Sequence, residues 1–325
     1  MGDRGRVPGF RVAARASAWC VRAILLALGG AAAMAPSCAR APVNATNRQP
    51  ALELRFLDVG QGDAILIRHA GKTVLVDAGE TDGIVTILRA LGVDTIDLAV
   101  ASHNHDDHIG GLDAVLQAFP VRFYLDNGHP ANTRIQRRVL ELVRDRGVTY
   151  RDAGALTDSV IALGDAALRV IPSPVTGSRV NPNDESVALV LERAGFRALL
   201  TGDSERRELG ALLRGARIPD VDVLKAPHHG SRTGVIPSWL ARTRPEVVAI
   251  SVGAGKSYGL PDEDALAAYG EGGRTVLRTD LDRDIVVTVD GRGCYEVRAG
   301  RAGEEVRARG GPAACAVPPT QESLP

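Results

Sequence analysis

The sequence predicts an α/β protein in which β-sheets are covered by layers of helices. Its 325 residues are 45% hydrophobic and 24% charged, which is typical of a globular chain with a substantial core. Short apolar runs typical of strands gather early and late in the chain, and amphipathic patterns typical of helices lie between them. These observations exclude a peptide hormone, a disulfide knot and a fibrous repeat.

The N-terminal segment has the pattern of a secretory signal. Five arginines precede an apolar run at residues 23–35, and small residues follow it. The run has 13 residues, whereas a membrane-spanning helix needs about 20, so a permanent anchor is disfavoured. We therefore predict a signal peptide over residues 1–41; a lipoprotein signal with Cys38 as the lipidated residue is the alternative. The protein is expected to be exported, either secreted or held at the cell envelope.

Export would leave the remaining chain with an acidic excess. Residues 1–41 hold six arginines and one aspartate, so the balance of 39 Lys and Arg against 39 Asp and Glu becomes 33 against 38. Such a surface lacks the general positive field that draws proteins onto nucleic acid, and binding to DNA or RNA would need a local basic groove.

The rest of the chain is predicted to form a linker at 42–51, one domain at 52–298 and a disordered tail at 299–325. The first strands are expected at 52–59, 63–68 and 73–77, with turns between them. Later strands are expected at 97–101, 121–125, 167–171, 186–191, 197–201, 221–224, 247–252, 275–279 and 285–289. Helices are expected at 82–91, 110–118, 132–146, 205–214 and 262–269.

The four cysteines limit how a metal could be bound. They stand at positions 20, 38, 294 and 315 and lack the CxxC spacing of a zinc site. Any metal would therefore be held by histidine and carboxylate. In an exported protein Cys294 and Cys315 could form a disulfide that pins the tail, and two free thiols are the alternative.

A histidine and aspartate cluster follows the strand expected at 97–101. The segment at 102–111 reads SHNHDDHIGG and opens a helix. In an extended loop His103 and His105 point the same way, whereas Asp107 and His108 can turn toward a second position. Imidazole nitrogens and carboxylate oxygens in this arrangement suit two divalent cations. The cluster therefore predicts a metal centre; a solvated polar loop is the alternative.

This H-x-H-x-D-H pattern resembles the signature of the metallo-β-lactamase superfamily. Four further segments resemble the hydrolase domain of ComEC-type competence proteins, namely FLDVGQGDA at 56–64, LVDAG at 75–79, LTGD at 200–203 and PHHGS at 227–231. The resemblance covers residues 52–298. It implies a four-layer αββα sandwich with two divalent metal ions, Zn²⁺ or Mn²⁺, at one edge between two sheets.

The resemblance also implies roles for individual residues. The expected metal ligands are His103, His105, Asp107, His108, Asp203 and His228. Asp203 follows a strand, and the resemblance makes it the carboxylate shared by two ions; capping the next helix is the alternative. Of the two adjacent imidazoles, His228 is assigned to the metal. His229 is assigned to catalysis beside Asp107.

Supporting residues are expected around this centre. Asp77 ends a strand and is expected to orient the histidine loop by accepting hydrogen bonds, with Asp58 in a similar supporting place. The expected substrate contacts are Asn183, Lys225 and Ser231. The chain also departs from the superfamily pattern: Asn183 stands where a histidine is usual, as it does in the competence proteins, and Leu260 stands where relatives have histidine. The second metal site would be weakened unless His228 or His229 compensates.

The predicted chemistry is hydrolysis by a metal-activated water, without a covalent intermediate. Neither a GxSxG elbow nor a P-loop is present in the sequence. The resemblance points to phosphodiester cleavage in DNA. Full competence proteins carry a polytopic membrane channel that is not expected in this chain, so a role in importing DNA does not transfer. Two alternatives remain: hydrolysis of an ester, thioester, lactone or β-lactam carbonyl, and a catalytically weakened module that binds metal or nucleic acid.

Overall fold

The computed structural model describes residues 51–130, 133–156, 159–175, 177, 180–215, 218–255, 258–300, 305–312 and 315. The predicted signal peptide, the lipidation site at Cys38 and residues 42–50 of the predicted linker lie outside these residues. No helix in the described ranges is both long enough and apolar enough to cross a membrane.

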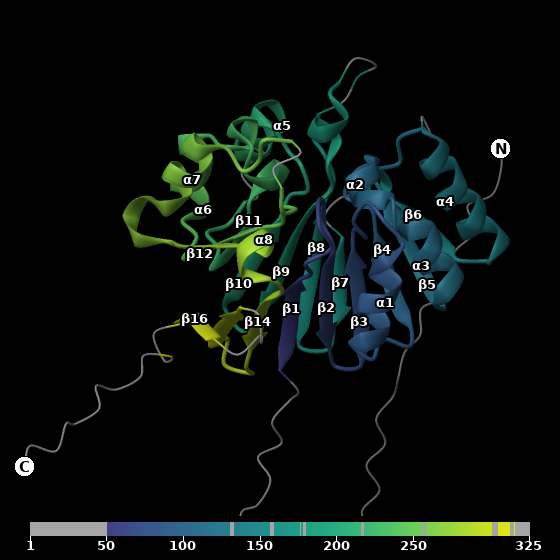
Figure 1. Ribbon diagram of the computed structural model, residues 1–325, viewed down its shortest axis with the longest axis horizontal. Coiled ribbons are helices and arrows are strands. Elements are labelled where there is room, and N and C mark those ends of the chain that lie inside the picture. Colours follow the sequence, from purple (N-terminus) through teal and green to yellow (C-terminus); the bar gives the residue numbers. More distant parts are fainter. Residues whose placement is uncertain are drawn as a thin grey trace, which may run out of the picture. The chain divides into compact units, whose positions relative to one another are not determined.

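Two β-sheets form the centre of the fold (Figure 1). Within the described residues the first sheet has nine strands in the order β16-β15-β14-β1-β2-β3-β4-β5-β6. Their bounds are β1 Leu52–Phe56, β2 Ile65–His69, β3 Lys72–Val76, β4 Ile96–Val100, β5 Val121–Asp126, β6 Thr149–Asp152, β14 Ile285–Val289, β15 Tyr295–Ala299 and β16 Glu305–Gly310.

The second sheet has seven strands in the same described part of the chain, in the order β13-β12-β11-β10-β9-β8-β7. Their bounds are β7 Val160–Leu163, β8 Ala166–Ile171, β9 Ala188–Arg193, β10 Phe196–Leu200, β11 Val223–Lys225, β12 Val247–Ile250 and β13 Thr275–Arg278.

The main core lies between the two sheets. Burial alternates along β1, where Leu52, Leu54 and Phe56 are buried and the residues between them are partly exposed. Successive side chains of a strand point to opposite faces of the sheet, so Leu52, Leu54 and Phe56 all point to the same face. Leu54 shares one cluster with Leu168 and Leu191 of the second sheet, so the facing sides of the sheets bury each other.

Helices cover the outer faces of both sheets. The longer ones are α1 Gly83–Ala90, α3 Leu112–Ala118 and α4 Arg134–Asp145 on the first sheet, and α5 Arg206–Arg214, α6 Pro237–Thr243 and α7 Glu263–Gly270 on the second. The short ones are α2 Asp106–Ile109, α8 Thr279–Asp282, η1 Ala153–Ala155, η2 Pro182–Glu185, η3 Pro227–Gly230, η4 Arg232–Gly234 and η5 Glu271–Gly273. The layers therefore run helix, sheet, sheet, helix, and the predicted four-layer sandwich is confirmed.

The helix expected at 132–146 shows how local sequence sets an element. Thr133 precedes α4, and its side chain accepts a hydrogen bond from the backbone N–H of Gln136 at 3.1 Å. This contact satisfies one of the open donors at the start of a helix. Val139, Leu142 and Val143 then recur at helical spacing and are buried in the outer cluster of the first sheet.

The C-terminal tail differs from the prediction. Disorder was expected over 299–325, but β16 pairs antiparallel with β15 at the edge of the first sheet. Its sequence, EVRARG, alternates charged and small apolar residues, a composition that suits an exposed edge strand as well as a disordered segment. Cys294 and Cys315 form a disulfide, so the disulfide alternative holds for this pair.

Two parallel strand pairs bring loops together at one edge. In the first sheet β3 runs parallel to β4, and in the second β10 runs parallel to β11. The carboxyl ends of parallel strands meet on the same side of a sheet, where the loops that follow them collect functional groups. The loops after β3, β4, β10 and β11 carry Asp77, the histidine cluster, Asp203 and the His228–His229 pair.

Candidate metal centre

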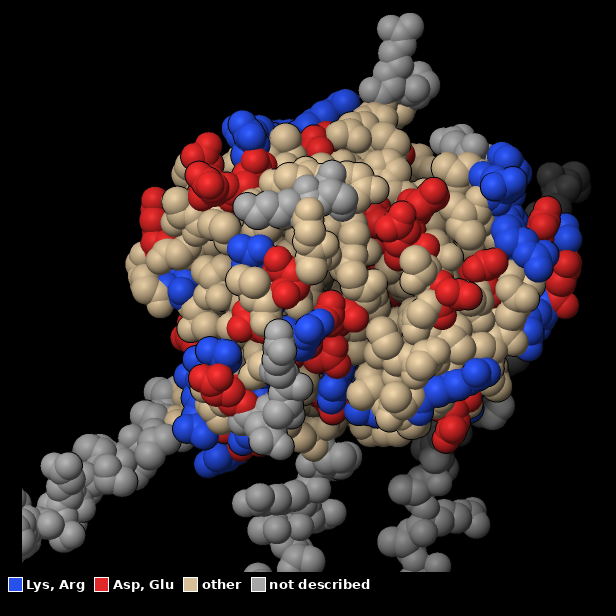
Figure 2. All heavy atoms as spheres, viewed as in Figure 1, with Lys and Arg blue, Asp and Glu red and all other residues tan. Residues whose placement is uncertain are grey.

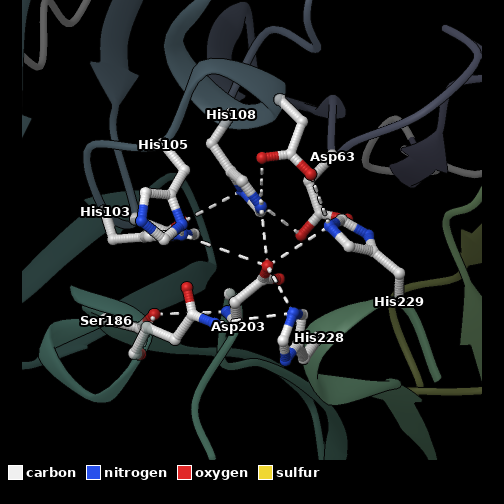
Figure 3. A network of polar contacts seen from close by, with 12 residues as sticks. Asp63, His103, His105, His108, Ser186, Asp203, His228 and His229 are labelled. Carbon is white, nitrogen blue, oxygen red and sulfur yellow. Dashed lines mark hydrogen bonds and ion pairs between the residues drawn. The ribbon is translucent and has the colours of Figure 1, made fainter. Parts of the chain in front are cut away.

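The histidine loop divides into two parts. His103 and His105 lie in the loop after β4, and Asp107 and His108 lie in the first turn of α2. The Nε2 atom of His103 is 3.1 Å from Nδ1 of His105. Figure 3 shows these two rings together on one side of Asp203 and the ring of His229 on the other. This is the division that the alternating spacing predicted.

Asp77 fixes the orientation of His108. Its Oδ2 atom accepts hydrogen bonds from Nδ1 of His108 at 2.8 Å and from the hydroxyl of Ser102 at 2.7 Å. Its Oδ1 atom accepts from the backbone N–H of Ser102, also at 2.7 Å. Because Nδ1 of His108 donates to a carboxylate, its Nε2 atom is directed into the cluster, where a bound cation would replace the proton of the charged ring.

His229 is held in the same manner from the opposite sheet. It is 1% exposed, and its Nδ1 atom donates to the backbone carbonyl of Ser251 at 2.9 Å. Its Nε2 atom lies 3.1 Å from Oδ2 of Asp107 and 3.3 Å from Oδ2 of Asp203. Neither this Nε2 atom nor that of His108 makes a satisfactory hydrogen bond, although both are buried.

His228 lies beside this group and nearer to solvent. Both His228 and His229 have positive φ, at 48° and 51°, a conformation that turns the two adjacent rings in different directions. The Nδ1 atom of His228 is 3.1 Å from Oε1 of Glu205 and 3.2 Å from the hydroxyl of Thr233. Its Nε2 atom is 3.9 Å from Oδ2 of Asp203, and 24% of its side chain is exposed.

Asp203 is the centre of the cluster. Its Oδ2 atom lies 3.2 Å from Nε2 of His108 and 4.0 Å from Nε2 of His103, in addition to its contact with His229. Burial alone would raise the pKa of this carboxyl, but His108, His229 and Lys225 hold the pKa well below its ordinary value. Asp203 is therefore a buried anion.

The pKa values of two imidazoles near this anion shift in opposite directions, for different reasons. Burial of His229 disfavours the charged ring, but the carboxylates of Asp203 and Asp107 raise its pKa to about 9. Burial of His103, together with the adjacent charge of His108, lowers the pKa of His103 well below its ordinary value. A neutral His103 keeps the lone pair that a metal ligand needs.

These residues fit a divalent cation. Asp107, His108, Asp203 and His229 each offer one ligand atom, and the four atoms lie within 4.8 Å of one another. Two buried Nε2 atoms with no hydrogen bond face two carboxylates, and nitrogen and oxygen ligands of this kind suit zinc or manganese. A cation at this position would satisfy all of these atoms at once.

Several predicted site residues are brought together as expected, and others are not. His103, His105, Asp107, His108 and Asp203 meet in the cluster. The two adjacent histidines exchange places relative to the prediction: His229, expected in catalysis, lies among the ligand atoms, and His228, expected on the metal, lies at the rim.

The expected substrate contacts also differ. Lys225 is fully buried beneath the cluster, so the prediction that it contacts substrate is wrong. Asn183 and Ser231 are buried as well: the amide of Asn183 donates to Glu205 at 3.1 Å, and the Ser231 hydroxyl accepts from the backbone N–H of Thr233 at 3.3 Å.

Asp58 does not support the site. Its carboxylate pairs with Arg283 at 3.0 Å, and its backbone N–H donates to Asp284. The aspartate of the same motif that reaches the cluster is Asp63, which lies 3.6 Å from Nδ1 of His229. Asp58 and Asp63 both belong to the segment FLDVGQGDA, and the sequence spacing does not indicate which of the two reaches the cluster.

The position of Leu260 leaves the metal group intact. Leu260 packs against the outer core of the second sheet, and the described residues beside it contribute no atom to the group that could hold a metal. The imidazole of His229 lies among the atoms that could hold a metal ion, and it could take the place of the histidine that relatives have at position 260.

Comparison of the sequence with known proteins places this chain in a family. The profile described as "Metallo-beta-lactamase superfamily" matches residues 57–253. ComE operon protein 3 of Bacillus subtilis is 26% identical over 255 residues, which is 72% of this chain and 32% of that protein. Competence protein ComA of Neisseria gonorrhoeae is 30% identical over 237 residues, or 69% of this chain and 30% of that protein.

An endoribonuclease of Gibberella zeae is also similar. It is 28% identical over 222 residues, which is 60% of this chain and 26% of that protein. The chain thus matches about a third or less of the length of each of these curated relatives.

Proposed function

Since this chain belongs to the metallo-beta-lactamase superfamily of metal-dependent hydrolases, we propose that it hydrolyses phosphodiester bonds in nucleic acid, and specifically in DNA. The observation that carries the proposal is the pair of buried imidazoles, His108 and His229, whose free Nε2 atoms face the carboxylates of Asp107 and Asp203. The proposed resident ions are two, Zn²⁺ or Mn²⁺, with His103 and His105 serving the second beside Asp203.

A bound divalent cation would supply a nucleophile, because it lowers the pKa of a water molecule to near neutrality. Asp107 is the partly exposed member of the ligand group, with 22% of its side chain exposed. Its carboxylate is placed to accept a hydrogen bond from the attacking water and to orient it toward phosphorus. Gln61, whose amide lies 3.5 Å from Oδ2 of Asp107, restrains that carboxylate.

His228 is proposed as the proton donor to the leaving oxygen. Its Nδ1 atom lies 3.1 Å from Oε1 of Glu205, and this contact fixes the direction of the ring. Its Nε2 atom lies at the partly exposed rim of the cluster, and the donor role requires a proton on this atom. As the bond from phosphorus to the leaving oxygen breaks, transfer of this proton neutralises the charge that forms there.

The relatives favour nucleic acid as the substrate class. One is named as a competence protein and another as an endoribonuclease. Basic and acidic side chains are interspersed over the face drawn in Figure 2. The chain would therefore bind a polyanion through the metal centre and local contacts more than through a general positive field.

We also propose that the protein is exported. The signal-like pattern at residues 1–41 and the disulfide between Cys294 and Cys315 support this, because disulfides persist in oxidising compartments. Mass spectrometry of the protein recovered from its native cells should show a chain that begins at residue 42, or a lipid on Cys38. An intact N-terminus would refute export by this signal.

The activity is tested with one purified batch of residues 42–325. The protein is stripped with a chelator, reloaded with Zn²⁺ or Mn²⁺, and assayed on single- and double-stranded DNA, RNA, bis-p-nitrophenyl phosphate, a thioester, a lactone and a β-lactam. We expect metal-dependent cleavage of DNA and of the phosphate diester. Asp203→Asn should abolish it, whereas the control Asp220→Asn, at a carboxylate with 52% of its side chain exposed, should not.

The possible outcomes separate the alternatives. Absence of metal-dependent cleavage of every phosphodiester would refute the proposal. Cleavage of a thioester, lactone or β-lactam in its place would establish the carbonyl alternative, which uses the same activated water.

A further inference from the structure

Lys225 lies beneath the metal-binding group, at the end of β11, with none of its side chain exposed. A buried ammonium is strongly unfavourable unless carboxylates and carbonyls surround it. The Nζ atom of Lys225 lies 2.5 Å from Oδ2 of Asp63 and donates to the carbonyl of Gly202 at 2.9 Å. Its third neighbour is Oδ1 of Asp203, at 3.5 Å. The buried ammonium therefore has three protein oxygens within 3.5 Å, two of them on carboxylates.

The two oxygens of Asp203 consequently have different neighbours. Oδ1 faces Lys225, while Oδ2 faces the Nε2 atoms of His108 and His229 at 3.2 and 3.3 Å. While the ammonium holds Oδ1, the carboxylate cannot turn to offer both oxygens to the imidazoles.

Asp63 anchors Lys225 from the other half of the fold. It lies in the loop between β1 and β2, and its backbone N–H donates to the carbonyl of Asp107 at 3.2 Å. Gly62 makes this approach possible, since a Cβ atom there would lie 1.9 Å from the same carbonyl. The Asp63–Lys225 pair therefore connects the loop that carries Asp107 with the strand that leads to His229.

We propose that Lys225 is a positioning residue of the metal centre: anchored by Asp63, it holds Oδ1 of Asp203 so that Asp203 presents only Oδ2 to the metal ions. This inference rests on the proposed function only in requiring a bound metal. The identity of the substrate does not enter. Lys225 itself touches neither the substrate nor the reacting atoms.

The test distinguishes a role of Lys225 in positioning Asp203 from a role limited to its ion pair with Asp63. Lys225→Met removes the ammonium and leaves the buried charge of Asp63 without its nearest cation, so this variant should unfold at a lower temperature than the wild type. Adding Asp63→Asn removes that charge, and the double variant K225M/D63N should recover most of the lost thermal stability. Metal affinity is measured on the same samples by competition with a chromophoric chelator for Zn²⁺.

If Lys225 positions Asp203, the double variant should bind Zn²⁺ about 10- to 100-fold more weakly than the wild type despite its recovered stability, the usual effect of removing a group that orients a ligand. Asp63→Asn alone keeps the ammonium and its contacts with Gly202 and Asp203, so it should lose less than tenfold. Lys72→Met is the control, because Lys72 forms an ion pair of 3.2 Å with Asp97 while 44% exposed, and it should change neither quantity.

Wild-type zinc affinity in a stable double variant would overturn the positioning role and leave Lys225 a partner of Asp63 alone. A loss in Asp63→Asn equal to that of the double variant would also overturn it, because the effect would then belong to Asp63. A wild-type protein that binds no metal would refute the proposed function instead.

Discussion

Replacing Asp77 by asparagine should weaken metal binding through His108 without a direct contact between residue 77 and the ion. Asp77 has φ of 59°, a conformation that asparagine tolerates as well as aspartate does. The side chain keeps its shape, so the change falls on the hydrogen bonds. An amide nitrogen in the place of Oδ2 cannot accept from Nδ1 of His108, now 2.8 Å away.

The size of the expected loss of metal affinity follows from the tautomer of His108. To meet an amide N–H, its Nδ1 atom must become the acceptor, and the ring proton then moves to Nε2, the atom that would bind the metal. Loss of such an orienting group typically weakens metal affinity about 10- to 100-fold, or about 1.4–2.7 kcal/mol. The loss of charge-assisted hydrogen bonds should also lower the stability, by about 1.5–3 kcal/mol for each bond.

The assay is a zinc titration of the stripped protein against a chromophoric chelator, with thermal unfolding recorded on the same samples. Asp126→Asn is the matched control. Asp126 is also buried at the end of a strand of the first sheet, but it accepts from the N–H of Gly128 and the hydroxyl of Tyr150. Equal zinc affinity in D77N and the wild type would refute the reasoning.

Three further predictions address other parts of the structure. His229→Ala should lose bound metal, whereas His228→Ala should keep it and turn over about 10²- to 10⁴-fold more slowly; elemental analysis beside turnover measures both, and the reverse pattern would restore the original assignment of the pair. Burial raises the pKa of Glu208 to about 8, so the wild type should lose up to about 1.4 kcal/mol of stability for each pH unit as the pH rises from about 4.5 toward 8, because the folded state retains a proton that the unfolded state releases. Denaturant unfolding at pH 5 and pH 8 should show that Glu208→Gln lacks this part of the loss, and identical pH dependence in both proteins would disprove it. Cys294→Ser should lower the free energy of unfolding by about 3 kcal/mol, since the disulfide joins residues 21 apart; if a reductant leaves the wild type unchanged, the bond does not form.

Much of the fold and the family could be predicted from local sequence. The resemblance to the superfamily and to the competence proteins is confirmed, and so is the four-layer sandwich. His103, His105, Asp107 and His108 stand within six residues after a buried strand. Their meeting depends on one loop and one helical turn, which is why spacing alone could predict it.

The rest depends on packing between distant segments. Which of His228 and His229 points toward the cluster depends on the positive φ values of both residues, and these cannot be predicted from the sequence of the motif. The burial of Lys225 follows from its pairing with Asp63, 162 positions earlier in the chain. In the sequence alone, a lysine near a histidine pair suggests a contact with phosphate. Only the packing of both halves of the fold around Lys225 shows that its side chain is buried.

The central claim is that Asp107, His108, Asp203 and His229 hold a divalent cation. It is tested most directly by anomalous diffraction from crystals of the zinc-loaded protein, with data collected on both sides of the zinc absorption edge. We expect a strong anomalous peak between Oδ2 of Asp203 and the Nε2 atoms of His108 and His229. Loaded crystals with no peak among these four side chains would contradict it.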